Sequence, residues 1–135
     1  MQTLSIRTNK RCELIDITRD VQRCVEQSGV KGGVAYVCSP HTTAGITINE
    51  NADPDVVRDL IYALGRIVPD SGYLHCEGNS DAHTKALLTG ASASVIIEDS
   101  RLCLGTWQSV YFCEYDGPRQ RKVYIKIIAC EHERT

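Results

Sequence analysis

Apolar and polar residues alternate along this chain in patterns that predict seven strands and three helices. Alternation or short apolar runs predict strands at 3–7, 12–17, 34–38, 46–49, 95–98, 107–115 and 122–130. Helical spacing of apolar residues predicts helices at 18–28, 53–65 and 81–88. Asp116-Gly117-Pro118 separates the last two strands, so we expect them to pair as an antiparallel hairpin. This order favours an α+β fold.

Composition places the chain among ordinary globular proteins. Its 135 residues suit a single domain spanning 1–135, with 42% hydrophobic and 24% charged residues and a formal net charge of −2. No basic stripe is present, which argues against nucleic-acid binding. No apolar run reaches membrane-spanning length and the N-terminus lacks a signal-peptide pattern, so we expect a cytoplasmic protein without a membrane partner.

Seven cysteines do not form a recognisable framework. Their number is odd and no pair has the Cys-x-x-Cys spacing of a structural zinc site. We therefore interpret most of them as small buried hydrophobic groups in a reducing compartment. Cys76 stands apart, because it lies between His75 and Glu77.

Polar chemistry is concentrated in two segments, 41–59 and 75–83. Three of the four histidines, His41, His75 and His83, lie in them. An imidazole can bind a metal or carry a proton near neutral pH, and three of them suit a catalytic zinc-type site with one open position. Taken singly, each histidine has a structural explanation; His83, for example, could face the core. Clustered with carboxylates, the three predict a metal-binding site.

The carboxylates and cations near these histidines extend the hypothesis. Glu50 and Asp53 could hold a hard cation or act as a general acid/base pair, and Asp53-Pro54 also has the form of a helix start. The candidate partners for a phosphate are Lys85, Arg101, Arg119 and Arg121. No Gly-x-x-x-x-Gly-Lys-Ser/Thr or Gly-x-Gly-x-x-Gly loop is present, so the usual nucleotide-binding motifs are absent.

Five motifs follow one another over nearly the whole chain. They are His41-Thr-Thr-Ala-Gly-Ile-Thr-Ile-Asn-Glu-Asn-Ala-Asp-Pro-Asp-Val, Val68-Pro-Asp, His75 with Glu77-Gly78, Ala82-His83-Thr-Lys85 and Gly105-Thr-Trp-Gln108. In this combination the chain resembles the YjbQ-like family, formerly an uncharacterised protein family and now often called secondary thiamine-phosphate synthase.

The resemblance implies a fold and an assembly. The family fold is a two-sheet antiparallel β-sandwich with flanking helices in the order β2-α-β2-α-β3, assembled as a homotrimer. The apolar pattern of this chain predicts one helix more than that order contains.

The resemblance also implies an activity and site residues. Family members are credited with joining hydroxymethylpyrimidine pyrophosphate to thiazole phosphate with release of pyrophosphate, as their main or a side activity. The family's shared polar positions then imply the following roles: Glu50, Asp53 and Lys85 catalytic; Glu77, Trp107 and Gln108 substrate-binding; His41, His75 and His83 metal-binding. Arg121, one of the candidate phosphate partners, is expected to bind the substrate beside them.

The identity of the metal stays open at this point. Release of pyrophosphate suits magnesium on oxygen ligands, whereas three histidines suit a softer divalent metal such as zinc. Two further hypotheses remain beside the synthase: a metal-dependent hydrolase, and a non-catalytic trimeric module that binds a small ligand or a metal. In the enzymatic hypotheses the partner is a small phosphorylated molecule.

Overall fold

The computed structural model describes residues 1–130 and contains eight strands and three helices within them. The strands are β1 (Gln2–Arg7), β2 (Glu13–Asp16), β3 (Gly33–Cys38), β4 (Ala44–Glu50), β5 (Ser92–Glu98), β6 (Arg101–Leu102), β7 (Gln108–Glu114) and β8 (Gln120–Ala129). The helices are α1 (Thr18–Ser28), α2 (Pro54–Ile67) and α3 (Ser80–Thr89). The three predicted helices are thus confirmed, as is the α+β class; the short strand β6 was not predicted.

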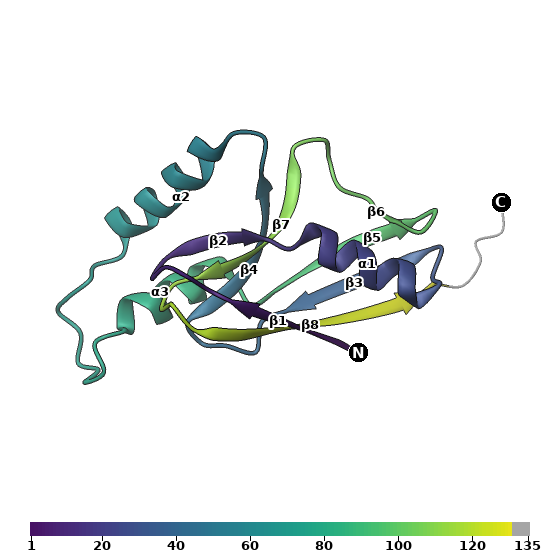
Figure 1. Cartoon of the computed structure of the whole chain (residues 1–135). Helices are drawn as coiled ribbons and strands as arrows, with labels where there is room; N and C mark the ends of the chain where they lie inside the picture. The colour runs from purple at the N-terminus through teal and green to yellow at the C-terminus, as the bar shows by residue number, and fades with distance from the viewer. Residues whose placement is uncertain (131–135) are drawn as a thin grey trace.

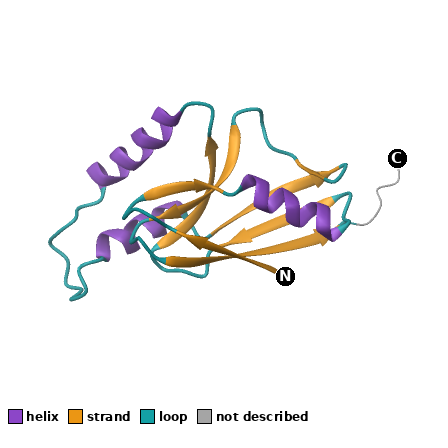
Figure 2. Ribbon diagram, in the orientation of Figure 1, coloured by secondary structure: helices purple, strands orange, loops and turns teal. Residues whose placement is uncertain are grey.

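The strands form two antiparallel sheets (Figure 1). One sheet has five strands in the order β1-β8-β3-β5-β6, and the other has three in the order β2-β7-β4. Helix α1 runs along the large sheet, whereas α2 and α3 lie at the side of the small one (Figure 2). Within the described residues, none of the helices combines the length and the apolar character needed to cross a bilayer.

The predicted C-terminal hairpin is wrong. Strand β7 pairs with β2 and β4, while β8 pairs with β1 and β3 in the other sheet. The intervening segment therefore crosses between sheets, with a cis peptide bond at Gly117–Pro118. A Cβ on residue 117 would collide with the backbone oxygen of Lys10, so this crossing accepts only glycine there. Turn residues predict a change of chain direction, but they do not specify which sheet the next strand joins.

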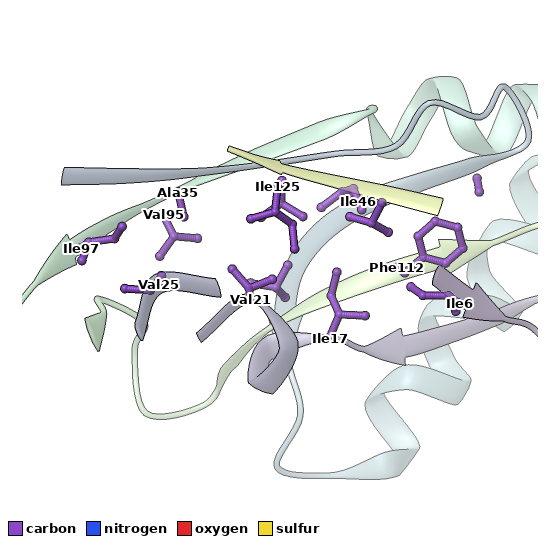
Figure 3. Close-up of a cluster of buried hydrophobic side chains, with 14 residues drawn as sticks. Ile6, Ile17, Val21, Val25, Ala35, Ile46, Val95, Ile97, Phe112 and Ile125 are labelled. Carbon is purple, nitrogen blue, oxygen red and sulfur yellow. The ribbon is translucent and has the colours of Figure 1, made fainter. Parts of the chain in front are cut away.

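The core lies between the inner faces of the two sheets and α1 (Figure 3). Val21 and Val25 of α1 are fully buried, as is Phe112 of β7. A second apolar cluster joins α3, through Ala82 and Ala86, to the outer face of the small sheet. Helix α2 packs at the edge of this cluster and has no buried residue. The start of β4 and the start of α3 are thereby held next to the crossing from β7 to β8.

Candidate functional site

A polar cleft of about 340 Å³ opens where the β3–β4 loop, the start of α3 and the β7–β8 crossing meet. Its lining residues, from three separate segments, are Pro40, His41, Thr42, Thr43, Glu77, Asn79, His83, Asp116, Arg119 and Arg121. We call it the His41 cleft. Four of the predicted site residues, His41, Glu77, His83 and Arg121, are therefore brought together by the fold.

A buried ion pair forms the floor of the His41 cleft. The Arg121 side chain is 5% exposed and that of Glu114 is 0% exposed. Arg121 Nε donates to Glu114 Oε1 at 2.8 Å, Nη2 donates to Glu114 Oε2, and Nη2 also donates to Thr43 Oγ1 at 2.8 Å. Burial acts to raise the pKa of Glu114, but hydrogen bonds from Arg121 and Thr8 outweigh it and lower that pKa. Glu114 is therefore ionised at neutral pH and fixes the guanidinium.

The ring of His41 is held in one orientation by the neighbouring strand. Its Nε2 accepts a hydrogen bond from the backbone N–H of Lys122 at 2.9 Å. Burial, followed by the positive charge of Arg121, lowers the pKa of His41 below its ordinary 6.5. The neutral ring with an accepting Nε2 carries its proton on Nδ1, so Nδ1 is left as a donor. The predicted metal-ligand role of His41 would require this hydrogen bond to break.

A second charged group borders the His41 cleft at Asp116. Arg119 Nη2 donates to Asp116 Oδ2 at 3.0 Å, as does Asn79 Nδ2 at 3.0 Å. Burial acts to raise the pKa of Asp116, but the hydrogen bonds from Asn79 and Arg119 outweigh it and lower that pKa. The Oδ1 atom of Asn79 is buried without a hydrogen-bond partner among the described residues. An acceptor of this kind is suited to a donor brought by a ligand.

The other two predicted ligands lie beside each other at the rim. The rings of His75 and His83 are 5.7 Å apart between centroids, edge to face. His75 Nε2 lies 3.6 Å from Glu77 Oε2, in an exposed pair. Within residues 1–130, however, no three His, Cys, Asp or Glu side chains converge closely enough to hold a metal ion. The arrangement therefore does not support a metal bound by His41, His75 and His83 together. Metal binding by this protein stays a prediction.

Four predicted residues gather at the opposite end of β4 instead. Glu50 pairs in register with Gln108, the backbone N–H of Asn51 donates to Trp107, and Asp53 follows directly. The seven residues of β4 separate this Glu50 end from the His41 cleft by roughly 20 Å, at about 3.3 Å per residue. Asp53 Oδ1 accepts from the N–H of Asp55 at 2.9 Å, which confirms its predicted role as a helix cap.

Lys85 occupies neither place. It is 9% exposed on the inner side of α3, and its Nζ lies 3.8 Å from Cys12 Sγ. Lys85 is not among the residues that line the His41 cleft. The arrangement within one chain therefore gives no support to the predicted catalytic role of Lys85, which stays a prediction.

Sequence reasoning missed Glu114, Thr43 and Asp116. Glu114 had a usable signal, because it is a charged residue at the end of an apolar strand and three basic residues, Arg119, Arg121 and Lys122, lie within four positions around the start of the next strand. Thr43 and Asp116 had none, since a threonine in a loop and an aspartate in a turn are common without any function.

The comparisons with known proteins agree with one another. The family described as "UPF0047 protein YjbQ-like" matches residues 2–130. The UPF0047 protein YugU of Bacillus subtilis is 52% identical over 130 residues, covering 95% of this chain and 98% of its own. The UPF0047 protein MJ1081 of Methanocaldococcus jannaschii is 53% identical over 124 residues, covering 91% of this chain and 90% of its own.

Solved structures show the same fold. A crystal structure of an uncharacterized YjbQ/UPF0047 protein from Clostridium acetobutylicum superimposes with a TM-score of 0.93 at 55% identity, covering 95% of this chain and 100% of its own. That of the hypothetical protein APE1520 from Aeropyrum pernix gives 0.90 at 30% identity, covering 95% and 97%. These descriptions name no substrate and no reaction.

Proposed function

The chain belongs to the UPF0047 YjbQ-like family, and we propose that it is an enzyme that acts on a small phosphorylated molecule in the His41 cleft. The observation that carries this proposal is the meeting of two guanidinium groups and two imidazoles, from separate segments, in one polar cleft. Guanidinium groups suit phosphate oxygens and imidazoles suit proton transfer, which are the two requirements of phosphate-ester and pyrophosphate chemistry.

The arginines supply the anion-binding half of this function. Arg121 uses Nε and Nη2 to hold Glu114 and Thr43, and Arg119 uses Nε and Nη2 to hold Asp116. In both residues Nη1 has no hydrogen-bond partner within residues 1–130, so it is left to bind the ligand that we propose. Because both guanidinium groups are fixed in advance, little side-chain entropy is lost when a phosphate binds.

The histidines supply the proton-transfer half. His41 is neutral near pH 7 with its proton on Nδ1, so it can donate a hydrogen bond to a phosphate or leaving-group oxygen. His83 faces the same cleft from α3 and is the second imidazole within it. Asn79 Oδ1, the buried acceptor without a partner, would orient an N–H or O–H group of the substrate.

The reaction implied by the family resemblance is thiamine-phosphate synthesis, in which hydroxymethylpyrimidine pyrophosphate and thiazole phosphate are joined and pyrophosphate is released. Two anionic groups then have to be held, one on each substrate, and pyrophosphate is the leaving group. The cleft carries Glu77 and Asp116 on its lining and Glu114 in its floor, so its carboxylates outnumber its two arginines. A divalent metal, zinc or magnesium, would add the missing positive charge and stays a prediction, because within residues 1–130 no three His, Cys, Asp or Glu side chains converge to hold it.

Binding of inorganic pyrophosphate to the purified protein, measured by calorimetry with and without Mg²⁺, tests the proposed site. Arg119→Met should weaken binding at least about tenfold, since it removes a charge-assisted hydrogen bond worth about 1.5–3 kcal/mol. The matched control is Gln108→Ala at the Glu50 end, which should bind as the wild type does. Equal loss in both variants, or unchanged binding in Arg119→Met, would place the anion elsewhere.

Turnover distinguishes the synthase from a binding module. The wild type is incubated with both thiamine precursors and the release of pyrophosphate is followed, alongside metal analysis of tag-free protein. His83→Gln should abolish turnover and leave the fold intact. Pyrophosphate binding without turnover of either precursor would favour the non-catalytic module, and hydrolysis without joining would favour the hydrolase.

The homotrimer is supported by an uncovered apolar face on the large sheet. Ile128, Val34 and Ile96 are direct cross-strand neighbours on β8, β3 and β5, and Ile96 is 61% exposed. No helix covers this row within the described residues. Ile96→Lys should dissociate the assembly, which light scattering measures. Leu87→Lys, at an exposed position of α3, is the control and should leave the assembly intact. A wild type that is monomeric at micromolar concentration would refute the trimer.

A further inference from the structure

Lys85 and Cys12 form a contact that the His41 cleft does not use. Lys85 Nζ lies 3.8 Å from Cys12 Sγ, and this sulfur is the only hydrogen-bond partner of Nζ within residues 1–130. Asp81, one turn earlier on α3, is paired with Arg11 instead. A lysine that is 91% buried without a carboxylate beside it is unusual, because its desolvation is not offset by an opposite charge.

Cys12 differs from its buried neighbour in being reachable. It lines a cleft of about 470 Å³ beneath α2, together with Leu14, Val57 and Ile61. Cys113 packs in the same apolar cluster, but it is 1% exposed and burial raises the pKa of its thiol to about 12. A small oxidant can therefore reach Cys12 through the α2 cleft, whereas Cys113 is an inert thiol.

We propose that Cys12 and Lys85 are a peroxide-responsive pair that closes into a reversible sulfenamide bridge. The Cys12 sulfur is first oxidised by hydrogen peroxide to the sulfenic acid; the O–O bond breaks and one oxygen leaves as water. Lys85 Nζ then attacks that sulfur, an S–N bond forms and the S–O bond breaks. The ammonium group loses two protons: one joins the departing hydroxide to make water, and the other passes to solvent.

The positions of the two groups make the bridge attainable. The Nζ atom ends a flexible four-carbon chain, so the 3.8 Å gap can close by side-chain rotation while α3 stays in place. Sulfenic acids condense with thiols or nitrogen, and the nitrogen that donates to this sulfur is an amine without another hydrogen-bond partner among residues 1–130. A thiol reductant restores both side chains.

The bridge would couple oxidation to the cleft. It ties α3 to the segment that precedes β2, and α3 also carries His83 into the His41 cleft. Oxidised protein should therefore hold α3 more firmly, and the sulfur is protected from irreversible oxidation to the sulfinic acid.

Peptide mapping by mass spectrometry tests the pair on the intact wild-type chain after treatment with a small excess of hydrogen peroxide. We expect a Cys12–Lys85 linked peptide whose mass is lower by two hydrogen atoms and which disappears on incubation with dithiothreitol. The exposed thiols Cys103 and Cys130 serve as internal reporters that peroxide has acted.

Two variants separate the bridge from ordinary thiol oxidation. Lys85→Met keeps the length and apolar stem of the side chain, so it should lose the link and accumulate sulfinic acid at Cys12. Cys12→Ser should lose the link and leave Lys85 unmodified. Cys12 converted to sulfinic acid in the wild type without a linked peptide overturns the proposal, as does an unmodified Cys12 when Cys103 and Cys130 are oxidised.

Discussion

The two ends of β4 carry similar polar residues and have opposite environments. At the His41 end, a guanidinium, an imidazole and two carboxylates are fixed by side-chain hydrogen bonds, and the central ion pair is buried. At the Glu50 end, Trp107 is 62% exposed and Gln108 is exposed, with its side-chain oxygen used by the N–H of Gly105. Density of polar residues along the sequence therefore does not locate a site; convergence of separate segments does.

The difference follows from what each end meets. The start of β4 faces the β7–β8 crossing and the start of α3, so two further segments add side chains to it. The end of β4 meets the β6–β7 loop and the cap of α2, and Asn51 Nδ2 donates to Asp16 Oδ2 at the end of β2 at 3.3 Å. Rigid, prearranged groups are what an active site requires, and among the described residues the His41 end holds its groups on a buried ion pair.

Removal of Arg121 should give the largest effect, and it tests most directly whether the two ends of β4 differ in burial. Arg121→Met leaves Glu114 as a buried carboxylate without its counter-charge, which costs about 3–5 kcal/mol of unfolding free energy. Urea denaturation followed by fluorescence measures the loss. Arg121→Met combined with Glu114→Leu should recover much of it, since an apolar pair needs no counter-charge. A cost below about 1 kcal/mol for the single variant would mean that the pair is solvated.

Acid should act on the same pair. Because the pKa of Glu114 is lowered below its ordinary 4.5, this group contributes stability that is complete above pH 4.5 and is lost as the pH falls through its folded value. Asp16, near the Glu50 end, also has a lowered pKa: burial acts to raise it, and hydrogen bonds from Thr18 and Asn51 outweigh that. The unfolding free energy, measured with urea from pH 6 to pH 2, should depend on pH much less in Glu114→Gln than in the wild type. In Asp16→Asn the pH dependence should decrease only slightly. A larger decrease in Asp16→Asn than in Glu114→Gln would contradict the dominant role of Glu114.

Several features of this comparison were predictable from the sequence. The three helices and the α+β class came from apolar periodicity, and the Asp53 cap came from the Asp-Pro pair, because these are local features. Convergence of His41, Glu77 and His83 was expected from the two polar segments that carry them, and Arg121 was expected beside them as a phosphate partner. The sheet change between β7 and β8, the Glu114–Arg121 pair and the burial of Lys85 were not predicted, since each depends on contacts between segments distant in the chain.

Substitution of Asp53 should have a smaller effect on the unfolding free energy. It also tests whether the Glu50 end takes part in catalysis. Asp53→Ala should cost about 1 kcal/mol, since it removes the acceptor for the N–H of Asp55. Asp53→Asn should keep nearly full stability because asparagine caps equally well, and it should keep turnover. A folded Asp53→Asn protein without turnover would restore the predicted catalytic role and place chemistry at both ends of β4.

The smallest effect should come from Arg58, which pairs with Asp55 on the exposed face of α2. Both side chains are mostly exposed, at 80% and 72%, and they share a single contact of 3.3 Å, whereas the buried pair has two hydrogen bonds. Arg58→Ala should therefore change the unfolding free energy by no more than about 0.5 kcal/mol, and 1 M salt should abolish the difference. Arg121→Met should keep its cost at the same salt concentration, because water and ions do not reach Glu114. Equal salt sensitivity of the two variants would show that burial does not distinguish the ends of β4.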